Sequence, residues 1–331
     1  MKASSISPIN IALIKYWGKR DQDLILPYNS SISMTVDGLY VHTTVDFDNK
    51  YTEDIFILND KEIAQESEEY KKYIGRFLNI IREKYNIDSK IKIVSKGNFP
   101  ASAGLASSAS GFYALSTAIN SALSLNLDKK ELSILSRQGS GSSARSIYSG
   151  FVEWKKGEKA DGSDSYAEQI INDWPDFRMV ICVTAEEEKK VKSRAGMAQS
   201  VSTSPMYSEW LLSIEDDLKK TKKGIKEKNF SIVGKTAEEN CLKMHAIMMT
   251  TKPSIIYWNN ITVKIIQSII DWRENGLESY FTIDAGPQVK ILCTENSVKE
   301  IVKNCKKIEG IKNIIVAKPG EGSKIVSKHL F

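Results

Sequence analysis

The segment KGNFPASAGLASSASGF, residues 96–112, places a run of small residues directly after KIKIVS, an alternating segment that predicts a β-strand. The Ala- and Leu-rich continuation predicts a helix that begins inside this run. Small residues bury little apolar area, but they let a backbone approach another molecule closely. Because the free N–H groups and the dipole at a helix N-terminus favour an anion, this strand–turn–helix unit is a candidate anion site. The alternative is a helix start that is merely packed by small residues.

Strand and helix patterns alternate along the rest of the chain, which predicts an α/β or α+β fold. The predicted strands are 9–17, 41–48, 90–95 and 177–185, a hairpin at 279–295, and a final strand at 313–320. The predicted helices are 68–85, 106–125, 129–139, 208–228, 230–251, 258–276 and 299–308. The pattern has no clear linker, and we place the change of domain near Ala185.

The composition is that of an ordinary globular protein. A length of 331 residues predicts about two domains, and 41% hydrophobic residues are enough for a large core. The net charge of +5 is spread along the chain, which argues against nucleic-acid binding but suits small anionic ligands. The four cysteines show no C-x-x-C spacing and only three histidines occur. This argues against zinc and disulfides and favours a reducing cytoplasm, and the N-terminus has no apolar run that predicts a signal or a membrane span.

Two further segments combine small residues with arginine. QGSGSSARS, residues 138–146, contains Arg145, and KKVKSRAGM, residues 189–197, contains Ser193 next to Arg194. Together with the first turn they indicate a ligand with more than one anionic group, although the last segment alone could be an exposed basic loop. The glycine spacing at 96–112 matches neither the dinucleotide fingerprint nor the Walker motif.

A lysine and an aspartate occupy unusual positions. Lys15 lies at the end of an apolar strand, where a cation is rarely placed without a partner. Asp284 lies at the mouth of the turn in FTIDAGP, where it either shapes the turn or provides a functional carboxylate. A buried pair of the two could tune an acid–base site, because each charge favours the other.

Five segments, in the order INIALIKYWGKRD, PASAGLASSASG, GSGSSARS, KSRAGM and FTIDAGP, resemble the diphosphomevalonate decarboxylases of the GHMP kinase superfamily. The resemblance extends from Asn10 to about Val289. It implies an α+β GHMP kinase fold, whose N-terminal domain (1–184) has a left-handed βαβ unit and whose C-terminal α+β domain (185–331) borders the active-site cleft. It also implies a homodimer.

The resemblance implies a two-step reaction in isoprenoid biosynthesis. ATP with Mg²⁺ phosphorylates the 3-hydroxyl of mevalonate 5-diphosphate, and loss of that phosphate and of CO2 then gives isopentenyl diphosphate. Asp284 would be the catalytic carboxylate, Lys15 the cation beside it, and Arg145 the partner of the substrate carboxylate. The implied substrate-binding residues are Tyr16, Lys19, Ser140, Gly141, Ser142, Ser193 and Arg194, and the implied nucleotide-binding residues are Gly104, Leu105, Ala106, Ser107 and Ser108. No protein ligand of a metal is implied.

Two departures from the family pattern leave alternatives open. Ala101 stands where Thr is common, and Gln288 stands where Asn is usual. The first falls in the nucleotide loop, so an ATP-independent mevalonate 3,5-bisphosphate decarboxylase is the main alternative, followed by a phosphomevalonate decarboxylase. A non-catalytic binding protein of the same fold would be expected to lack Lys15 or Asp284, and both are present.

Overall fold

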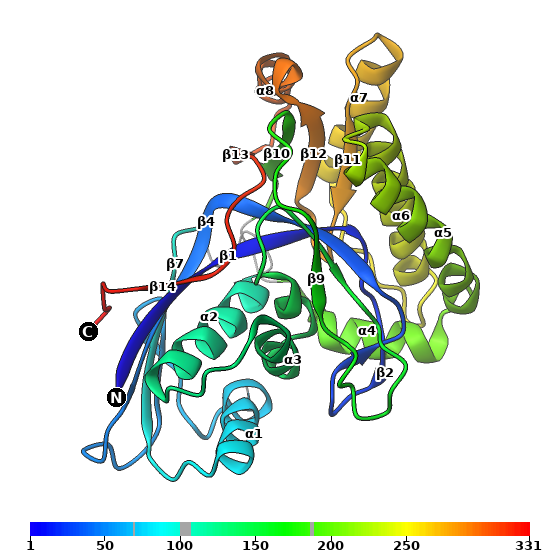
Figure 1. Ribbon diagram of the computed structural model, residues 1–331. Coiled ribbons are helices and arrows are strands. Elements are labelled where there is room, and N and C mark those ends of the chain that lie inside the picture. Colours follow the sequence, from blue (N-terminus) through cyan, green and yellow to red (C-terminus); the bar gives the residue numbers. More distant parts are fainter. Residues whose placement is uncertain (69, 100–106, 186–188) are drawn as a thin grey trace.

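The fold is built on two β-sheets with helices packed against them (Figure 1). The computed structural model describes residues 1–331 except 69, 100–106 and 186–188. The mixture of separate helices and mostly antiparallel strands confirms the α+β class.

The first sheet contains the N-terminal strands and the last strand of the chain. Its strand order is β14-β1-β4-β7-β5-β6, with β8 and β9 continuing beside β4. The bounds are β1 Lys2–Ile14, β4 Ser31–Phe47, β5 Ile55–Leu58, β6 Lys61–Glu62, β7 Ile91–Gly97, β8 Phe151–Trp154, β9 Ala167–Ile171 and β14 Lys324–Val326. The pairing of β5 with β7 is parallel, and the other pairings in this sheet are antiparallel.

Three helices lie on the same side of this sheet (Figure 1). They are α1 (Arg76–Tyr85), which follows a π-helical turn at Tyr70–Gly75, α2 (Ser107–Ala122) and α3 (Lys129–Gly139). α3 has a capping box, in which Asp128 accepts a hydrogen bond from the Glu131 N–H. A 3-10 turn (Gly141–Arg145) follows α3 directly.

The second sheet has the strand order β11-β12-β10-β13 and is antiparallel throughout. Its strands are β10 (Phe177–Val183), β11 (Tyr280–Ile283), β12 (Val289–Thr294) and β13 (Asn313–Ala317). Its helices are α4 (Ser193–Thr203), α5 (Tyr207–Lys226), α6 (Phe230–Met249), α7 (Asn260–Glu274) and α8 (Val298–Cys305). A small hairpin, β2 (Lys19–Asp21) with β3 (Leu26–Pro27), and a short 3-10 turn (Glu295–Ser297) complete the described elements.

The two sheets share a hydrophobic core at the end of β1. One buried cluster contains Ile11 of β1, Met179 of β10 and Met244 of α6. Thr282 of β11 also donates a hydrogen bond to the carbonyl of Ala12, at 3.3 Å. The end of β1, just before Lys15, therefore contacts the second sheet.

Most predicted elements are present, with some differences. The helix predicted over 68–85 is π-helical at its start, and 313–320 is not the final strand, because β14 follows it and returns to β1. The predicted division near Ala185 stays a prediction. β10, which ends just before it, pairs with β12 and β13 in the second sheet.

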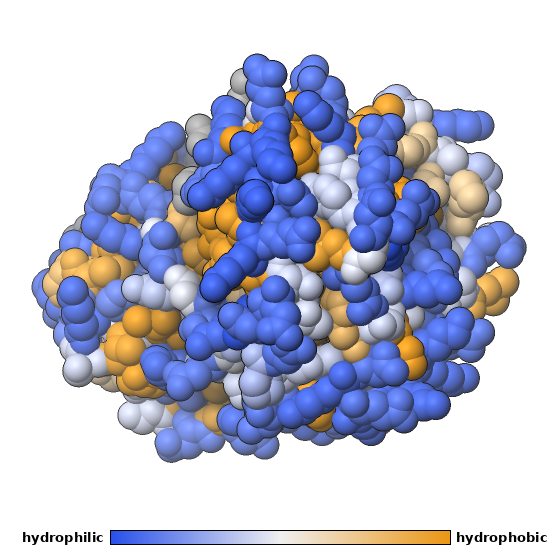
Figure 2. Space-filling model, turned by 90° about the horizontal axis from the view of Figure 1, so that it is seen from above, coloured by the Kyte–Doolittle hydropathy of each residue, from blue (hydrophilic) through white to orange (hydrophobic). Residues whose placement is uncertain are grey.

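The surface is mainly hydrophilic on the face seen in Figure 2, where hydrophobic residues gather in small separate areas. Within the described part of the chain, no helix combines the length and the apolar character that crossing a membrane requires.

Candidate active site

A cavity of about 520 Å³ brings together residues that are far apart in the sequence. Every predicted site residue whose side chain is described lines it: Lys15, Tyr16, Lys19, Ser108, Ser140, Gly141, Ser142, Arg145, Ser193, Arg194 and Asp284. Gly104, Leu105, Ala106 and also Ala101 lie outside the described residues, and Ser107 is described only as the first residue of α2. The cavity brings these residues together, while their roles stay predictions.

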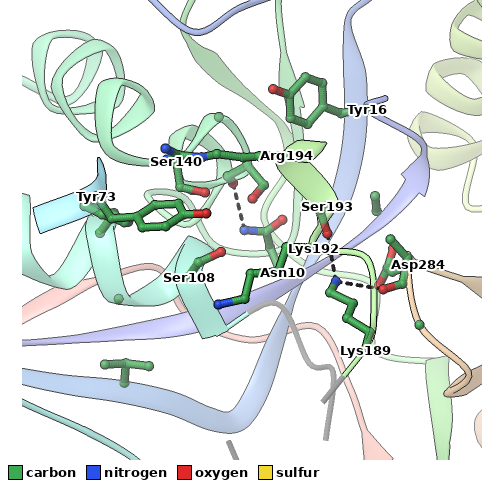
Figure 3. A pocket seen from close by; sticks show the side chains of 18 of the residues that line it. Asn10, Tyr16, Tyr73, Ser108, Ser140, Lys189, Lys192, Ser193, Arg194 and Asp284 are labelled. Carbon is green, nitrogen blue, oxygen red and sulfur yellow. Dashed lines mark hydrogen bonds between the residues drawn. The ribbon is translucent and has the colours of Figure 1, made fainter. Parts of the chain in front are cut away.

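The cavity lining is strongly cationic. Its described charged residues are six cations, Lys15, Lys19, Arg145, Lys189, Lys192 and Arg194, and one carboxylate, Asp284. Figure 3 shows Lys189 pointing toward the turn at Asp284, while Arg194 extends toward Ser140. Such an excess of positive charge in a concave site favours an anionic ligand with several charges.

Asp284 lies between two buried lysines. Its Oδ1 accepts a hydrogen bond from Lys15 Nζ at 2.8 Å, and its Oδ2 lies 3.2 Å from Lys290 Nζ. Both lysines are 1% exposed. Burial raises the pKa of Asp284, but the two ammonium groups outweigh it and hold that pKa well below its usual range. The carboxyl group is therefore ionised at neutral pH.

The turn at Asp284 is closed by the backbone. Gly286 N–H donates to the carbonyl oxygen of Asp284 at 2.7 Å, whereas the carboxylate oxygens face the lysines. The alternative that the Asp284 side chain serves to shape the turn is therefore not supported by its contacts.

Lys15 is fixed from both sides of its backbone. Its N–H donates to Asn240 Oδ1 of α6 at 2.8 Å, and its carbonyl accepts from Asn29 Nδ2 at 2.8 Å. Asn240 in turn donates to the buried Asp217 at 2.8 Å. These two backbone hydrogen bonds hold Lys15 in place, with its ammonium group beside Asp284.

Arg145 is a buried cation without a carboxylate partner among the described residues. Its Nη1 donates to Ser31 Oγ at 2.6 Å and its Nε donates to Asn10 Oδ1 at 3.2 Å. Burial lowers the pKa of Arg145 to about 10, although the charge of Asp284 opposes this. A buried guanidinium that meets only neutral acceptors is suited to bind an anion.

Tyr16 presents a hydroxyl group that has no hydrogen-bond partner among the described residues, although it is buried. Its ring contacts Trp154 edge-on at 4.8 Å between centroids. A Cβ at Gly141 would lie 2.9 Å from the Tyr16 hydroxyl oxygen, so this close approach requires glycine. Burial raises the pKa of Tyr16 well above its usual range, which keeps the hydroxyl a donor.

The first turn of α4 adds Ser193 and Arg194 to the cavity. The Arg194 guanidinium lies 4.1 Å from the centroid of the Tyr73 ring, and its Nη2 donates to the carbonyl of Gly139. Burial, together with the charge of Arg194, lowers the pKa of Lys19 to about 8. KKVKSRAGM is therefore not simply an exposed loop, because its serine and arginine begin a helix that borders the cavity.

Part of the cavity lining is apolar. This part comes from β4, β5, the π-helical turn and α2, the helix that begins at Ser107, and includes Val41, Phe56, Leu58, Tyr70, Ile74 and Leu115. An apolar region beside a helix start suits a ligand with both a flat ring system and phosphate groups.

Several residues of the site were not predicted from the sequence. Lys189 donates to Ser193 Oγ and to the carbonyl of Ala285, both at 2.8 Å (Figure 3). Gln288 accepts from the Thr184 N–H and donates to the carbonyl of Ala185, both at 2.6 Å, so it ties the end of β10 to the Asp284 turn. In the sequence, Gln288 is marked only by its departure from the family pattern. Lys290 is marked by its charge inside an apolar strand.

The fold and the cavity define a two-domain α+β protein that binds a small, multiply charged anion beside a buried Lys–Asp pair. The model of the diphosphomevalonate decarboxylase-like N-terminal domain matches residues 7–167, and that of the mevalonate 5-diphosphate decarboxylase C-terminal domain matches 179–316. The chain belongs to the diphosphomevalonate decarboxylase family, with the GHMP kinase fold.

Known relatives agree with this assignment over most of their length. The diphosphomevalonate decarboxylase of Danio rerio is 36% identical, over 90% of this chain and 77% of its own. The crystal structure of mevalonate diphosphate decarboxylase from Staphylococcus aureus is 38% identical, with a TM-score of 0.93 and 98% of both chains covered. A complex of the protein designated MDDEF with MVAPP, AMPPCP and magnesium is 39% identical, with a TM-score of 0.92 and 99% of both chains covered.

Proposed function

We propose that this chain catalyses the ATP-dependent decarboxylation of mevalonate 5-diphosphate. The products are isopentenyl diphosphate, CO2, ADP and phosphate. The observation that carries the proposal is the single cavity that combines six cations, the Lys15–Asp284 pair and an apolar region. The complex of MDDEF with MVAPP, AMPPCP and magnesium supports the same pair of substrates.

In the first step, Asp284 accepts a hydrogen bond from the 3-hydroxyl and receives its proton as the 3-oxygen bonds to the γ-phosphorus of ATP and the bond between that phosphorus and ADP breaks. Because its pKa is depressed, Asp284 then releases the proton to water and is ionised again for the second step. A carboxylate with a depressed pKa is a weak base, so its main contribution is to orient the hydroxyl for in-line transfer. Orientation is sufficient because phosphoryl transfer passes through a loose transition state, in which the attacking hydroxyl needs little activation. Lys15 holds Oδ1 in place.

In the second step, the bond between C3 and the phosphate oxygen breaks, and its electron pair leaves with the phosphate. The bond between the carboxyl carbon and C2 then supplies the electrons of the new C2–C3 double bond, and CO2 leaves. Positive charge develops at C3, where the Asp284 carboxylate stabilises it. Arg145 binds the substrate carboxylate that becomes CO2.

The remaining predicted residues fall into two sets, one that binds mevalonate 5-diphosphate and one that binds the nucleotide. Those that bind the 5-diphosphate are Tyr16, Lys19, Ser140, Gly141, Ser142, Ser193 and Arg194. By the family resemblance, Gly104, Leu105, Ala106, Ser107 and Ser108 bind the nucleotide phosphates, and the apolar lining receives the adenine.

Magnesium fits this site as an ion that the substrates bring. The described residues contain no cluster of three or more His, Cys, Asp or Glu that could hold a metal. The lining offers the Asp284 carboxylate and serine hydroxyls such as Ser108. This suits Mg²⁺, which is commonly held by one or two carboxylates, water and substrate phosphates. When bound, it neutralises phosphate charge.

The second candidate is the ATP-independent mevalonate 3,5-bisphosphate decarboxylase, which Ala101 in the nucleotide loop favours. Release of CO2 from mevalonate 5-diphosphate, with and without Mg·ATP, distinguishes the two. We expect CO2 only with ATP. Release from the 3,5-bisphosphate without ATP, and none from the diphosphate, would establish the second candidate. Mevalonate 5-phosphate with ATP tests a phosphomevalonate decarboxylase in the same assay.

We further propose that the protein is a cytoplasmic homodimer. The four cysteines are free thiols, and all are buried, which suits a reducing compartment. The dimer rests on the family resemblance.

A further inference from the structure

Lys290 is a buried lysine that lies behind the cavity and does not line it. It lies on β12, an inner strand of the second sheet, where it is paired with Ile181 of β10 and with Thr282 of β11. It is 1% exposed. Asp284 is the only partner that the described part of the chain offers its ammonium group.

A second lysine beside one carboxylate is energetically unusual. Lys15 already supplies the opposite charge for Asp284, so adding Lys290 leaves a group of three charges, two of them on buried lysines, with a net charge of +1. Burying an ion costs free energy, and apolar residues of similar size often replace buried ion pairs without loss of stability. Stability alone therefore does not account for Lys290, and its position points to the carboxylate that it contacts.

The two lysines contact different oxygens of Asp284. Lys15 donates to Oδ1, while Lys290 lies against Oδ2, which is inaccessible to solvent. About a quarter of the Asp284 side chain is exposed, and Oδ2 does not belong to this exposed surface. The pair of contacts fixes the rotation of the carboxylate, which leaves Oδ1 as the oxygen available to a ligand in the cavity.

We propose that Lys290 is a positioning residue for the decarboxylase reaction, which holds Asp284 ionised with Oδ1 facing the substrate. The proposal rests on the function proposed above, because it assigns Lys290 a role through Asp284. Lys290 does not touch the substrate.

The other groups that face Asp284 do not duplicate this role. Lys15 follows directly after β1, Arg145 lies in the 3-10 turn, and Lys189 lies in the segment before α4. From α6 come Cys241 and His245. Burial raises the pKa of Cys241 to about 11 and lowers that of His245 to about 3, so both are neutral between pH 5 and 8. Neither group therefore adds a titration of its own between pH 5 and 8.

The test compares wild type with Lys290→Met, an apolar replacement of similar length. The first measurement is the ¹³C signal of the Asp284 carboxyl group, which is assigned by its absence in Asp284→Asn. An opposite charge within ~4–6 Å lowers a carboxyl pKa by about 1–3 units, so its removal should raise the titration midpoint by that amount. Lys290→Gln, which keeps a polar group facing Oδ2, serves if Lys290→Met does not fold.

The second measurement is turnover with mevalonate 5-diphosphate and Mg·ATP. Because misplaced reacting groups cost up to ~10²-fold, we expect kcat to fall ~10- to 10²-fold, with KM changed less than ~3-fold. The acidic limb of the kcat profile should move to higher pH, because a carboxylate with one cation fewer takes up a proton more easily. Lys222→Met is the matched control. Lys222 also forms an ion pair, with 3.0 Å between its Nζ and the Glu153 carboxylate, but neither residue lines the cavity. This variant should leave kcat unchanged.

The two proposals fail in different ways. If wild type releases no CO2 from mevalonate 5-diphosphate, the proposed function is wrong, while the carboxyl titration still tests the contact. If Asp284 titrates identically in both proteins, or kcat of folded Lys290→Met equals that of wild type, the role of Lys290 is wrong.

Discussion

Replacing Asp284 with Asn removes the negative charge that two buried lysines share. Lys15 and Lys290 would then face an uncharged amide, both at 1% exposure. Removing one partner of a buried ion pair typically costs ~3–5 kcal/mol, because the other charge remains buried and uncompensated. The shape of the side chain is kept, so the loss of stability isolates the charge.

The protein can limit this cost by releasing a proton from one lysine. Burial already lowers the pKa of Lys290, and the Asp284 charge opposes that shift, so Lys290 is the expected donor. Deprotonating a lysine with an ordinary pKa of ~10.4 costs ~1.36 kcal/mol for each pH unit below that value. The stability deficit of Asp284→Asn is therefore limited to about 4.6 kcal/mol at pH 7 and about 1.9 kcal/mol at pH 9.

The direction of the pH dependence follows from the proton balance. In the variant, the lysine pKa is lower in the folded state than in the unfolded state, so the unfolded state binds more protons. Stability of the variant then rises with pH, and its deficit relative to wild type should shrink between pH 7 and 9. Urea unfolding at pH 7, 8 and 9 measures this. Glu153→Gln is the control, because its partner Lys222 is 36% exposed and can meet solvent. Its deficit should be small and independent of pH.

The rate of Asp284→Asn should fall ~10²-fold or more, because a poorly oriented hydroxyl costs up to ~10²-fold and the negative charge beside C3 is also lost. A deficit that stays constant from pH 7 to 9 would contradict the reasoning about the buried lysines. A folded variant that retains more than a tenth of the wild-type rate would contradict the role of the carboxylate.

Two further predictions concern the carboxylate end of the substrate and the assembly. Arg145→Ala should lower turnover at least ~10-fold, because truncating one partner of a buried charged contact costs ~2–5 kcal/mol, and normal turnover in a folded variant would show that Arg145 is misassigned. Sedimentation at micromolar concentration should give a dimer of the 37.1 kDa chain, and a monomer mass would refute the homodimer.

The sequence predicted those features whose cause is local. α5 and α6 are long helices whose periodic apolar residues are visible in any window of the sequence, and the structure places them within two residues of the expected bounds. Lys15 and Asp284 were found because each departs from its own segment, one as a cation after an apolar strand and the other as an acid at a turn.

The features that were missed depend on distant neighbours. β8 and β9 are only four and five residues long, and both are held by pairing, β8 to β4 and β9 to β8. β14 has three residues and forms on β1, more than 300 positions earlier in the chain. Short strands of this kind take their stability from the strands beside them, so their own residues carry little signal.

Lys290 shows why part of the site could not be assigned from its segment alone. In a strand with one face in solvent, alternation would turn a lysine between Val289 and Ile291 toward water. β12 is buried on both faces over Val289–Cys293, so alternation does not predict where Lys290 points. The signal that the sequence does carry is a charged residue among apolar ones. Lys15, at the end of an apolar strand, carries the same signal. Each of these lysines departs from its local segment, and the common reason is a carboxylate on a turn that is 269 positions from Lys15 in sequence but 2.8 Å from it in space.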